Sequence, residues 1–193
     1  MGAIFDLHCD TLTAFMTPGR GENTLNDPQS AFSLGRIPAG VCWAQCCAVF
    51  LPDRMPEEER MPFLRRHAEN FHRQAERFAD RAAYCRTAAE TEQAWSQGKT
   101  ALFLTVENGA VLGRDLKRVE ELSQAGVRMM TLTWNGVNSI ASGHQTDRGL
   151  TRFGREAVQE LLRPKICVDV SHLNDRGFWD LMEVTEGPVV ASH

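Results

Sequence analysis

Short apolar runs recur along the chain, and longer segments with a helical spacing of apolar residues separate them. Each run is roughly four to eight residues long, rich in aliphatic and β-branched types, and bounded by glycine or proline, a pattern typical of buried parallel strands. The predicted strands cover residues 3–10, 43–50, 100–107, 127–134, 166–172 and 188–193.

The segments between these runs predict amphipathic helices. The longest, residues 56–85, carries apolar residues at steps of three and four, namely Leu64, Ala68, Phe71, Ala75, Phe78 and Ala82. We expect His67 and His72 to lie on or beside its polar face without a chemical role. Further helices are predicted over residues 87–98, 116–126, 151–162 and 174–184. Asn174 is the expected N-cap of the last helix, and Gly98 and Gly126 stand at expected C-termini.

The alternation of strands and helices predicts an α/β fold in which helices pack against a parallel sheet. A doubly wound sheet and a (β/α)8 barrel both fit this order, although six strands are too few to close a barrel. The 193 residues match the prior of roughly 100–200 residues per domain, so we expect one domain over residues 1–193.

Composition excludes several classes of partner. The 21 Lys and Arg residues are outnumbered by 25 Asp and Glu residues, and no basic stripe indicates a nucleic-acid surface. No apolar run approaches the roughly 20 residues of a membrane-spanning helix, and the N-terminal sequence lacks a secretory signal. The six cysteines form no C-x-x-C pair, so we expect reduced, mostly buried thiols in the cytoplasm.

Side chains that can bind metals fall at the ends of four predicted strands. The first strand ends in His8 and Asp10, whose spacing of two predicts side chains on one face of a strand. The third ends in Glu107, the fifth in His172 and the sixth in His193. In a parallel sheet these ends are neighbours, and imidazole with carboxylate ligands suits Zn²⁺, Mn²⁺ or Fe²⁺, of which zinc is the commonest for hydrolysis. The set exceeds the needs of one ion, which favours two metals with Glu107 bridging them.

Each of these residues also has an ordinary interpretation. H-x-D is a common tripeptide, a Glu after a strand is more often a surface residue, and a His at a strand end is more often hydrogen-bonded within the fold. The coincidence at four strand ends nevertheless favours a metal site. His144, in the loop after the fourth run, either lines that site or is a solvated loop residue.

Several motifs together resemble the membrane dipeptidase (renal dipeptidase) family of zinc peptidases. They are FDLHCDT, AGVCWAQCCAVFLP, TVENG, MMTLTWNGVN, GLTRFGREAVQELL and VDVSHLNDRGFWDLMEVTEGPVVASH, in order from residue 4 to residue 193. The resemblance implies a (β/α)8 barrel, of which this chain carries about the first six βα units. It also implies two zinc ions, with His8 and Asp10 binding one, His172 and His193 the other, and Glu107 bridging both.

The resemblance implies hydrolysis of dipeptides by a hydroxide held between the two zinc ions, with Glu107 as the catalytic residue. Many relatives have a substrate-binding histidine where this chain has Trp134. We expect Trp134 and Asn135 to contact the substrate instead, while a packing role for Trp134 is the alternative.

The family pattern continues beyond the ASH motif with a substrate-binding Arg and a later Asp, so the sequence looks truncated at its C-terminus. Two other functions therefore stay open: a related metal-dependent hydrolase acting on another amide, and an inactive remnant. Exposed strand edges of an incomplete barrel would also permit a homo-oligomer.

Overall fold

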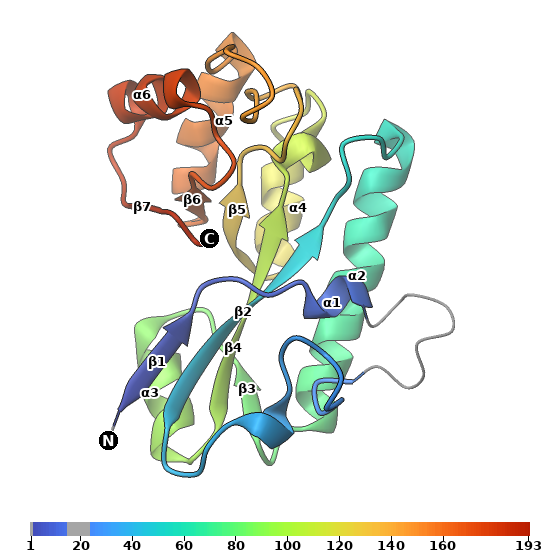
Figure 1. Ribbon diagram of the computed structural model, residues 1–193, viewed down its shortest axis with the longest axis vertical. Helices are drawn as coiled ribbons and strands as arrows, with labels where there is room; N and C mark the ends of the chain where they lie inside the picture. Colours follow the sequence, from blue (N-terminus) through green and yellow to red (C-terminus); the bar gives the residue numbers. More distant parts are fainter. Residues whose placement is uncertain (1, 15–23) are drawn as a thin grey trace. The chain divides into compact units, whose positions relative to one another are not determined.

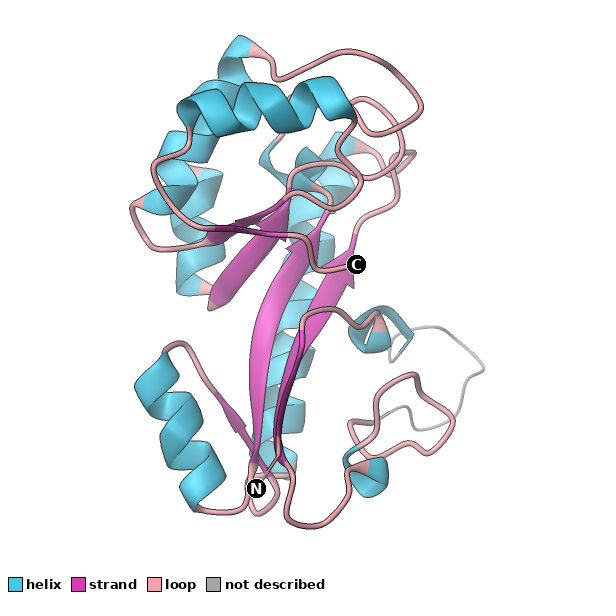
Figure 2. Cartoon of the chain, turned by 60° about the vertical axis from the view of Figure 1, so that its left-hand side comes forward, coloured by secondary structure: helices cyan, strands magenta, loops and turns pink. Residues whose placement is uncertain are grey.

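The computed structural model describes residues 2–14 and 24–193. The chain forms two compact units, the first made of Met1–Val49 and Arg66–Thr105, the second of Phe50–Arg65 and Val106–His193. The described residues contain seven strands, one more than the sequence predicts. Figure 2 distinguishes these strands, in magenta, from the helices, in cyan. Whether the chain is one domain stays a prediction.

The first unit is built on parallel strands. Strand β1 (Ala3–Asp6) pairs with β2 (Cys42–Phe50), and β3 (Ala82–Tyr84) pairs with β4 (Thr100–Glu107), while β2 and β4 are neighbours in the sheet (Figure 1). Every residue of β4 is buried, as are Ala44 to Val49 of β2. Continuous burial is expected where both faces of a parallel sheet are covered.

The described part of the first unit also contains α1 (Thr11–Ala14), the 3-10 helix η1 (Leu34–Arg36), the C-terminal part of α2 (Glu57–Arg77) and α3 (Ala88–Ser96). Helix α3 begins where Thr87 accepts a hydrogen bond from the backbone of Glu90, which is the geometry of an N-cap. The indole nitrogen of Trp95 donates to the carbonyl of Trp43 at 2.9 Å, which ties α3 to β2.

The second unit continues the alternation. After the 3-10 helix η2 (Gly109–Leu112) come α4 (Arg118–Gln124), β5 (Val127–Thr131), α5 (Arg152–Leu162), β6 (Cys167–Asp169), α6 (Asp175–Val184) and β7 (Val189–Val190) (Figure 1). Strands β5, β6 and β7 pair in parallel in that order, with Thr131 opposite Asp169 and Asp169 opposite Val190. Helix α4 packs on β5, α5 packs on β6, and α6 packs on α5.

The helix ends follow the sequence prediction closely. Asn174 caps α6 by accepting a hydrogen bond from the backbone of Gly177 at 2.7 Å. Gly98 and Gly126 have φ angles of +70° and +91°, the left-handed conformation that ends helices. Local capping residues therefore determine where these helices begin or end, and these residues can be recognised in the sequence.

The predicted strand ends are corrected by the structure. Strand β1 ends at Asp6, so the prediction that His8 and Asp10 share one face of a strand is wrong, because both lie beyond the strand. Strands β5, β6 and β7 end at Thr131, Asp169 and Val190, shorter than predicted. After β5, Leu132 and Thr133 remain buried although the strand has ended, so burial there does not require strand pairing.

Helix α2 (Glu57–Arg77) also departs from the prediction of residues 56–85. It ends eight residues earlier, and the three-residue strand β3 follows it. The predicted solvent-facing position of His67 is wrong as well, because its exposed fraction is only 3%, whereas its lack of a chemical role stays a prediction. His67 lies three residues after Leu64 and four before Phe71, and hence on a flank of the apolar stripe.

All six cysteines are free, and Cys9, Cys46, Cys47 and Cys85 are buried. Burial raises the pKa of the Cys47 thiol well above its ordinary value, so it is protonated at neutral pH. Among the described residues, no helix is both long enough and apolar enough to cross a bilayer.

A glycine inside helix α5 provides a test of the packing. Alanine normally stabilises a helix interior relative to glycine, but a Cβ at Gly154 would lie 2.1 Å from the carbonyl oxygen of Ile140. That oxygen is fixed because it accepts a hydrogen bond from the backbone of Thr151 at 2.8 Å. We expect Gly154→Ala to lower the free energy of unfolding by about 1–3 kcal/mol, measured by urea denaturation.

The matched control is Gly177→Ala in α6. A Cβ there would meet only side-chain atoms, the nearest being Leu173 Cδ2 at 3.1 Å, so a much smaller loss is expected. Stabilisation by Gly154→Ala would contradict the close approach of α5 to the Ile140 carbonyl.

Candidate metal centre

Three potential metal-donor atoms converge in the second unit. The Nε2 atom of His172 lies 3.0 Å from Glu107 Oε1, and the Nε2 atom of His193 lies 3.6 Å from the same oxygen. The two Nε2 atoms are 2.8 Å apart. Glu107 is buried, whereas about a third of the His193 side chain is exposed. The second unit by itself thus brings together Glu107, His172 and His193 of the predicted ligands.

Strand register explains why the two histidines meet. Strands β6 and β7 end at the paired residues Asp169 and Val190, and each histidine lies three residues beyond its strand. His172 reaches this position in a left-handed conformation with φ of +68°, which is strained for a residue with a Cβ. A turn in which Leu173 N–H donates to the carbonyl of Val170 at 3.1 Å holds that conformation.

A buried carboxylate, Asp169, joins the segments that carry the histidines. Its Oδ1 accepts from the backbone and hydroxyl of Ser171, at 2.9 and 2.7 Å, and from the backbone of Ser192 at 3.2 Å. Its Oδ2 accepts from the hydroxyls of Thr131 at 2.8 Å and Ser192 at 2.5 Å. The sequence analysis missed Asp169, although a strand-end Asp two residues before a Ser-His pair was a visible signal.

These donors keep Asp169 ionised. Burial alone would raise its pKa, but the hydrogen bonds from Ser192, Ser171 and Thr131 outweigh burial, so the pKa falls below its ordinary value of 3.8. The carboxylate is therefore a fixed acceptor at neutral pH.

Asn108 organises the backbone immediately after Glu107. It has a φ angle of +85°, and its side-chain amide donates to the carbonyl of Leu51 and to Asp53 Oδ1, both at 2.9 Å. Its Oδ1 accepts from the backbone of Ala110 at 3.1 Å and from Asn138 at 3.0 Å. This network fixes the chain direction after Glu107 and anchors the loop that follows β5.

Gly109 completes the E-N-G motif for a steric reason. A Cβ at this position would lie 2.6 Å from Ile140 Cδ1 and 2.8 Å from the carbonyl oxygen of Leu132. In this motif Glu107 has a side chain of a type that binds metals, Asn108 fixes the turn through its amide, and Gly109 is small enough for close packing.

His8 and Asp10 form the ligand-type pair of the first unit. His8 Nε2 lies 3.5 Å from Asp10 Oδ1, and the backbone N–H of His8 donates to Asp6 Oδ1 at 3.1 Å. Both residues line a cavity of about 420 Å³ together with Trp43 and Gln45. The loop is attached to β2, because the carbonyl of Cys9 accepts from the backbone of Ala48 at 2.9 Å. Their metal role stays a prediction.

The predicted substrate residues lie in the loop after β5. Trp134 is half-buried and packs edge-on against Phe50, with ring centroids 4.9 Å apart. The carbonyl of Asn135 accepts a hydrogen bond from the backbone of Gln145 at 3.3 Å. Gly143 permits this loop, since a Cβ there would lie 1.9 Å from the Trp134 carbonyl oxygen. His144 is exposed. Substrate contact by Trp134 and Asn135 stays a prediction.

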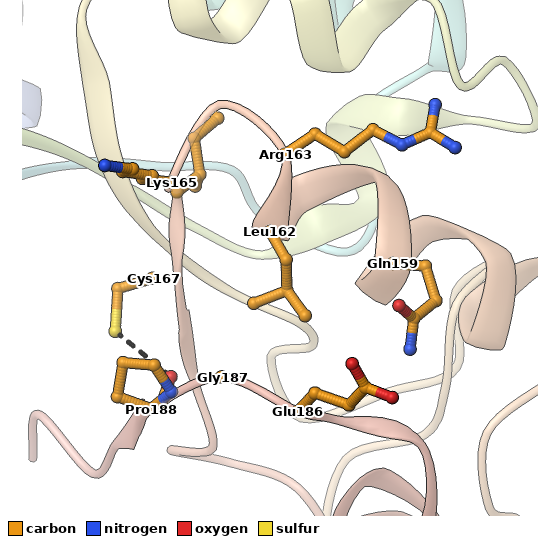
Figure 3. A pocket seen from close by; sticks show the side chains of 9 residues that line it. Gln159, Leu162, Arg163, Lys165, Cys167, Glu186, Gly187 and Pro188 are labelled. Carbon is orange, nitrogen blue, oxygen red and sulfur yellow. Dashed lines mark hydrogen bonds between the residues drawn. The ribbon is translucent and has the colours of Figure 1, made fainter.

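A larger cavity, of about 560 Å³, lies at the other end of the strands in the second unit (Figure 3). Leu162, Cys167 and Pro188 line it, and Cys167 is the first residue of β6 whereas His172 follows the last. Active sites of parallel α/β proteins form at the carboxyl ends of strands, so this cavity is not the candidate centre.

Comparison with known proteins identifies relatives of this chain. The family model described as membrane dipeptidase (peptidase family M19) matches residues 2–193. A metallopeptidase from Rhodobacter sphaeroides, solved with a phosphinate mimic of the dipeptide L-Ala-D-Ala, superposes with a TM-score of 0.87 at 23% identity. The match covers 100% of this chain and 65% of that chain.

Two further solved structures are similar. A dipeptidase AC, a metallopeptidase of family M19, gives a TM-score of 0.87 at 25% identity over 100% of this chain and 63% of that chain. An amidohydrolase from Pseudomonas aeruginosa gives a TM-score of 0.72 at 24% identity over 80% of this chain and 46% of that chain. This chain therefore spans less than two thirds of the length of each. The likeness confirms the predicted fold class, part of an α/β barrel.

The Asn108 network leads to a stability prediction. Asn108→Gly relieves the positive φ but removes four hydrogen bonds, each worth about 1 kcal/mol, so a net loss of about 1–3 kcal/mol is expected in urea denaturation. Lys165, exposed with a φ of +61°, is the matched control, and Lys165→Gly should stay within about 1 kcal/mol of the wild type. An equal change in the free energy of unfolding for the two variants would contradict a stabilising role of the Asn108 hydrogen bonds.

The lowered pKa of Asp169 predicts how stability depends on pH. The unfolded chain takes up a proton near the ordinary value of 3.8, whereas the folded chain resists protonation until a lower pH. Its contribution is therefore complete above pH 3.8 and is lost as the pH falls through the folded pKa. Urea denaturation between about pH 2.5 and 6 should show this loss for the wild type and not for Asp169→Asn.

The variant Thr131→Val retains the carboxyl group but removes one of its donors. As the pH falls, this variant should lose less of its free energy of unfolding than the wild type. A wild-type curve that coincides with the Asp169→Asn curve over this range would refute the assignment.

Proposed function

Because this chain belongs to the membrane dipeptidase family, peptidase family M19, we propose that it acts as a metal-dependent dipeptidase. The reaction would be hydrolysis of the peptide bond of a dipeptide. The observation that carries this proposal is the convergence of Glu107 Oε1 with the Nε2 atoms of His172 and His193.

The donor set fits a metal ion. A carboxylate oxygen and two imidazole nitrogens are ligands that zinc takes in catalytic sites. The three atoms lie between 2.8 and 3.6 Å from one another, close enough to bind one ion. Two imidazole nitrogens held this close also need either a shared proton or a cation between them, which further supports a metal site.

The finer proposal follows the family resemblance of the motifs. Two zinc ions would be bound, His8 and Asp10 serving one, His172 and His193 the other, and Glu107 both. When bound, the ions would supply a hydroxide nucleophile at neutral pH, since metal binding lowers the pKa of water to about 7.

The residues of this chain would hold and orient the reactants. Glu107 is buried at the end of β4, and Asn108 fixes the chain behind it, so its carboxylate is presented with little freedom. Trp134 and Asn135 carry N–H groups that can donate to the oxygen on which charge develops. The free cysteines support a reducing compartment, and a cytoplasmic location is part of this proposal.

A related hydrolase acting on another amide is the second candidate. The similarity to an amidohydrolase from Pseudomonas aeruginosa favours keeping it, since the same ligands could activate water against an N-acyl amino acid. The substrate separates the two candidates, because the metal chemistry is shared.

The test begins with the chain stripped of metal by a chelator and then titrated with Zn²⁺. Hydrolysis is measured on L-L and L-D dipeptides, including L-Ala-D-Ala, and on N-acetyl amino acids. We expect dipeptide hydrolysis that disappears with chelator and returns with zinc. Glu107→Gln should weaken zinc binding by at least about 100-fold, since loss even of an outer-shell partner costs about 10–100-fold.

The matched control is Glu120→Gln, the same substitution at an exposed position of α4. It should leave zinc affinity and hydrolysis unchanged. Chelator-resistant hydrolysis would refute the metal assignment, and turnover of N-acetyl amino acids alone would favour the second candidate.

A further inference from the structure

The Ser192 hydroxyl lies between the buried carboxylate and the imidazole of His193. Its oxygen is 2.5 Å from Asp169 Oδ2 and 2.8 Å from His193 Nδ1. Nδ1 faces Ser192, while Nε2 of the same ring faces Glu107 and His172. Each ring nitrogen therefore has its own set of neighbours.

Hydrogen placement in this chain of contacts has one consistent solution. A serine hydroxyl has one hydrogen to donate, and an ionised carboxylate can only accept. The Ser192 hydrogen is therefore directed to Asp169, which leaves the Ser192 oxygen as an acceptor toward His193. The hydrogen of that second contact then has to come from Nδ1 of His193.

Ser171 does not offer the Ser192 hydroxyl a competing acceptor. Its own hydrogen is donated to Asp169 Oδ1 at 2.7 Å, and its oxygen accepts from the backbone of Ser192 at 3.0 Å and of His193 at 3.2 Å. The contact between the two hydroxyl oxygens is longer, at 3.3 Å. The shorter contact to Asp169 Oδ2 thus determines the direction of the Ser192 hydroxyl.

We propose that Asp169, acting through the Ser192 hydroxyl, fixes the tautomer of His193 so that Nδ1 carries the hydrogen and Nε2 presents its lone pair to Glu107 and His172. Asp169 and Ser192 are then positioning residues. Neutral histidine in water favours the opposite tautomer, with the hydrogen on Nε2, which would block that nitrogen as a ligand. The consequence for zinc binding rests on the proposed function, whereas the tautomer does not.

The arrangement also determines His172 in the metal-stripped protein. Its Nε2 lies 2.8 Å from Nε2 of His193 and 3.0 Å from Glu107 Oε1, both of which are acceptors in this arrangement. His172 Nε2 therefore carries a hydrogen, and the two histidines have opposite tautomers. If Ser192 only held the loop after β7 in place, it would not impose opposite tautomers on His172 and His193.

The test is nuclear magnetic resonance of the 193-residue chain labelled with ¹⁵N-histidine and stripped of metal. At about pH 8.5, two units above the ordinary histidine pKa, two-bond ¹H–¹⁵N correlations distinguish the neutral tautomers. His193→Gln and His172→Gln identify the two signals. We expect the Nδ1–H tautomer at His193 and the Nε2–H tautomer at His172.

Ser192→Ala should move His193 toward the Nε2–H tautomer and weaken zinc binding by about 10–100-fold, measured by competition with a fluorescent chelator. Ser192→Thr retains the hydroxyl and should restore both. The matched control, Thr131→Val, removes another donor to the same carboxylate and should leave the His193 tautomer unchanged.

An Nε2–H tautomer at His193 in the wild type, or the same tautomer with and without the Ser192 hydroxyl, would overturn the inference. The expected tautomers without any zinc binding would support the inference and overturn the proposed metal site instead. The two proposals therefore fail separately.

Discussion

The hydrogen bonding of the Asp169 carboxylate is the constraint on which the candidate centre depends. A buried carboxylate is stable only when donors replace its water, and this one receives hydrogen bonds from β5, from the turn after β6 and from the segment after β7. These donors include side chains, Thr131, Ser171 and Ser192, that lie up to 61 residues apart in the chain. The hydrogen bonds that stabilise this one buried charge therefore fix the two turns that carry His172 and His193.

Glu107, like the two histidines, is held in place by a neighbouring polar side chain. The residue that is suited to bind metal ends a strand, and the next residue, Asn108, fixes the path of the chain through its side-chain amide. Most of the candidate ligands lie in loops, and polar side chains behind the loops supply the rigidity that loops lack.

Much of the fold was predictable because its signals are local. Thr87, Thr151 and Asn174 cap helices through bonds to residues three positions away, and the apolar runs mark the strands that form the core. The errors arose where local pattern and tertiary pairing differ. Strand β3 has three residues and exists through its pairing with β4, while its sequence continues the helical spacing of α2. Strand β5 ended earlier than predicted because Leu132 stays buried although it lies beyond the strand.

Apart from strand β3, the sequence by itself determined the order of the main strands and helices, the family and the residue types suited to bind metal, since each is encoded in residue types at short spacings. Only the tertiary structure decided which of those residues meet. The pairing of β6 with β7 aligns Asp169 with Val190, and this register brings the two histidine rings together beside Glu107. The structure alone also showed that Ser192 lies against Asp169 behind them, because a hydrogen bond between distant segments depends on where strands pair, although the position of Asp169 before a Ser-His pair is visible in the sequence.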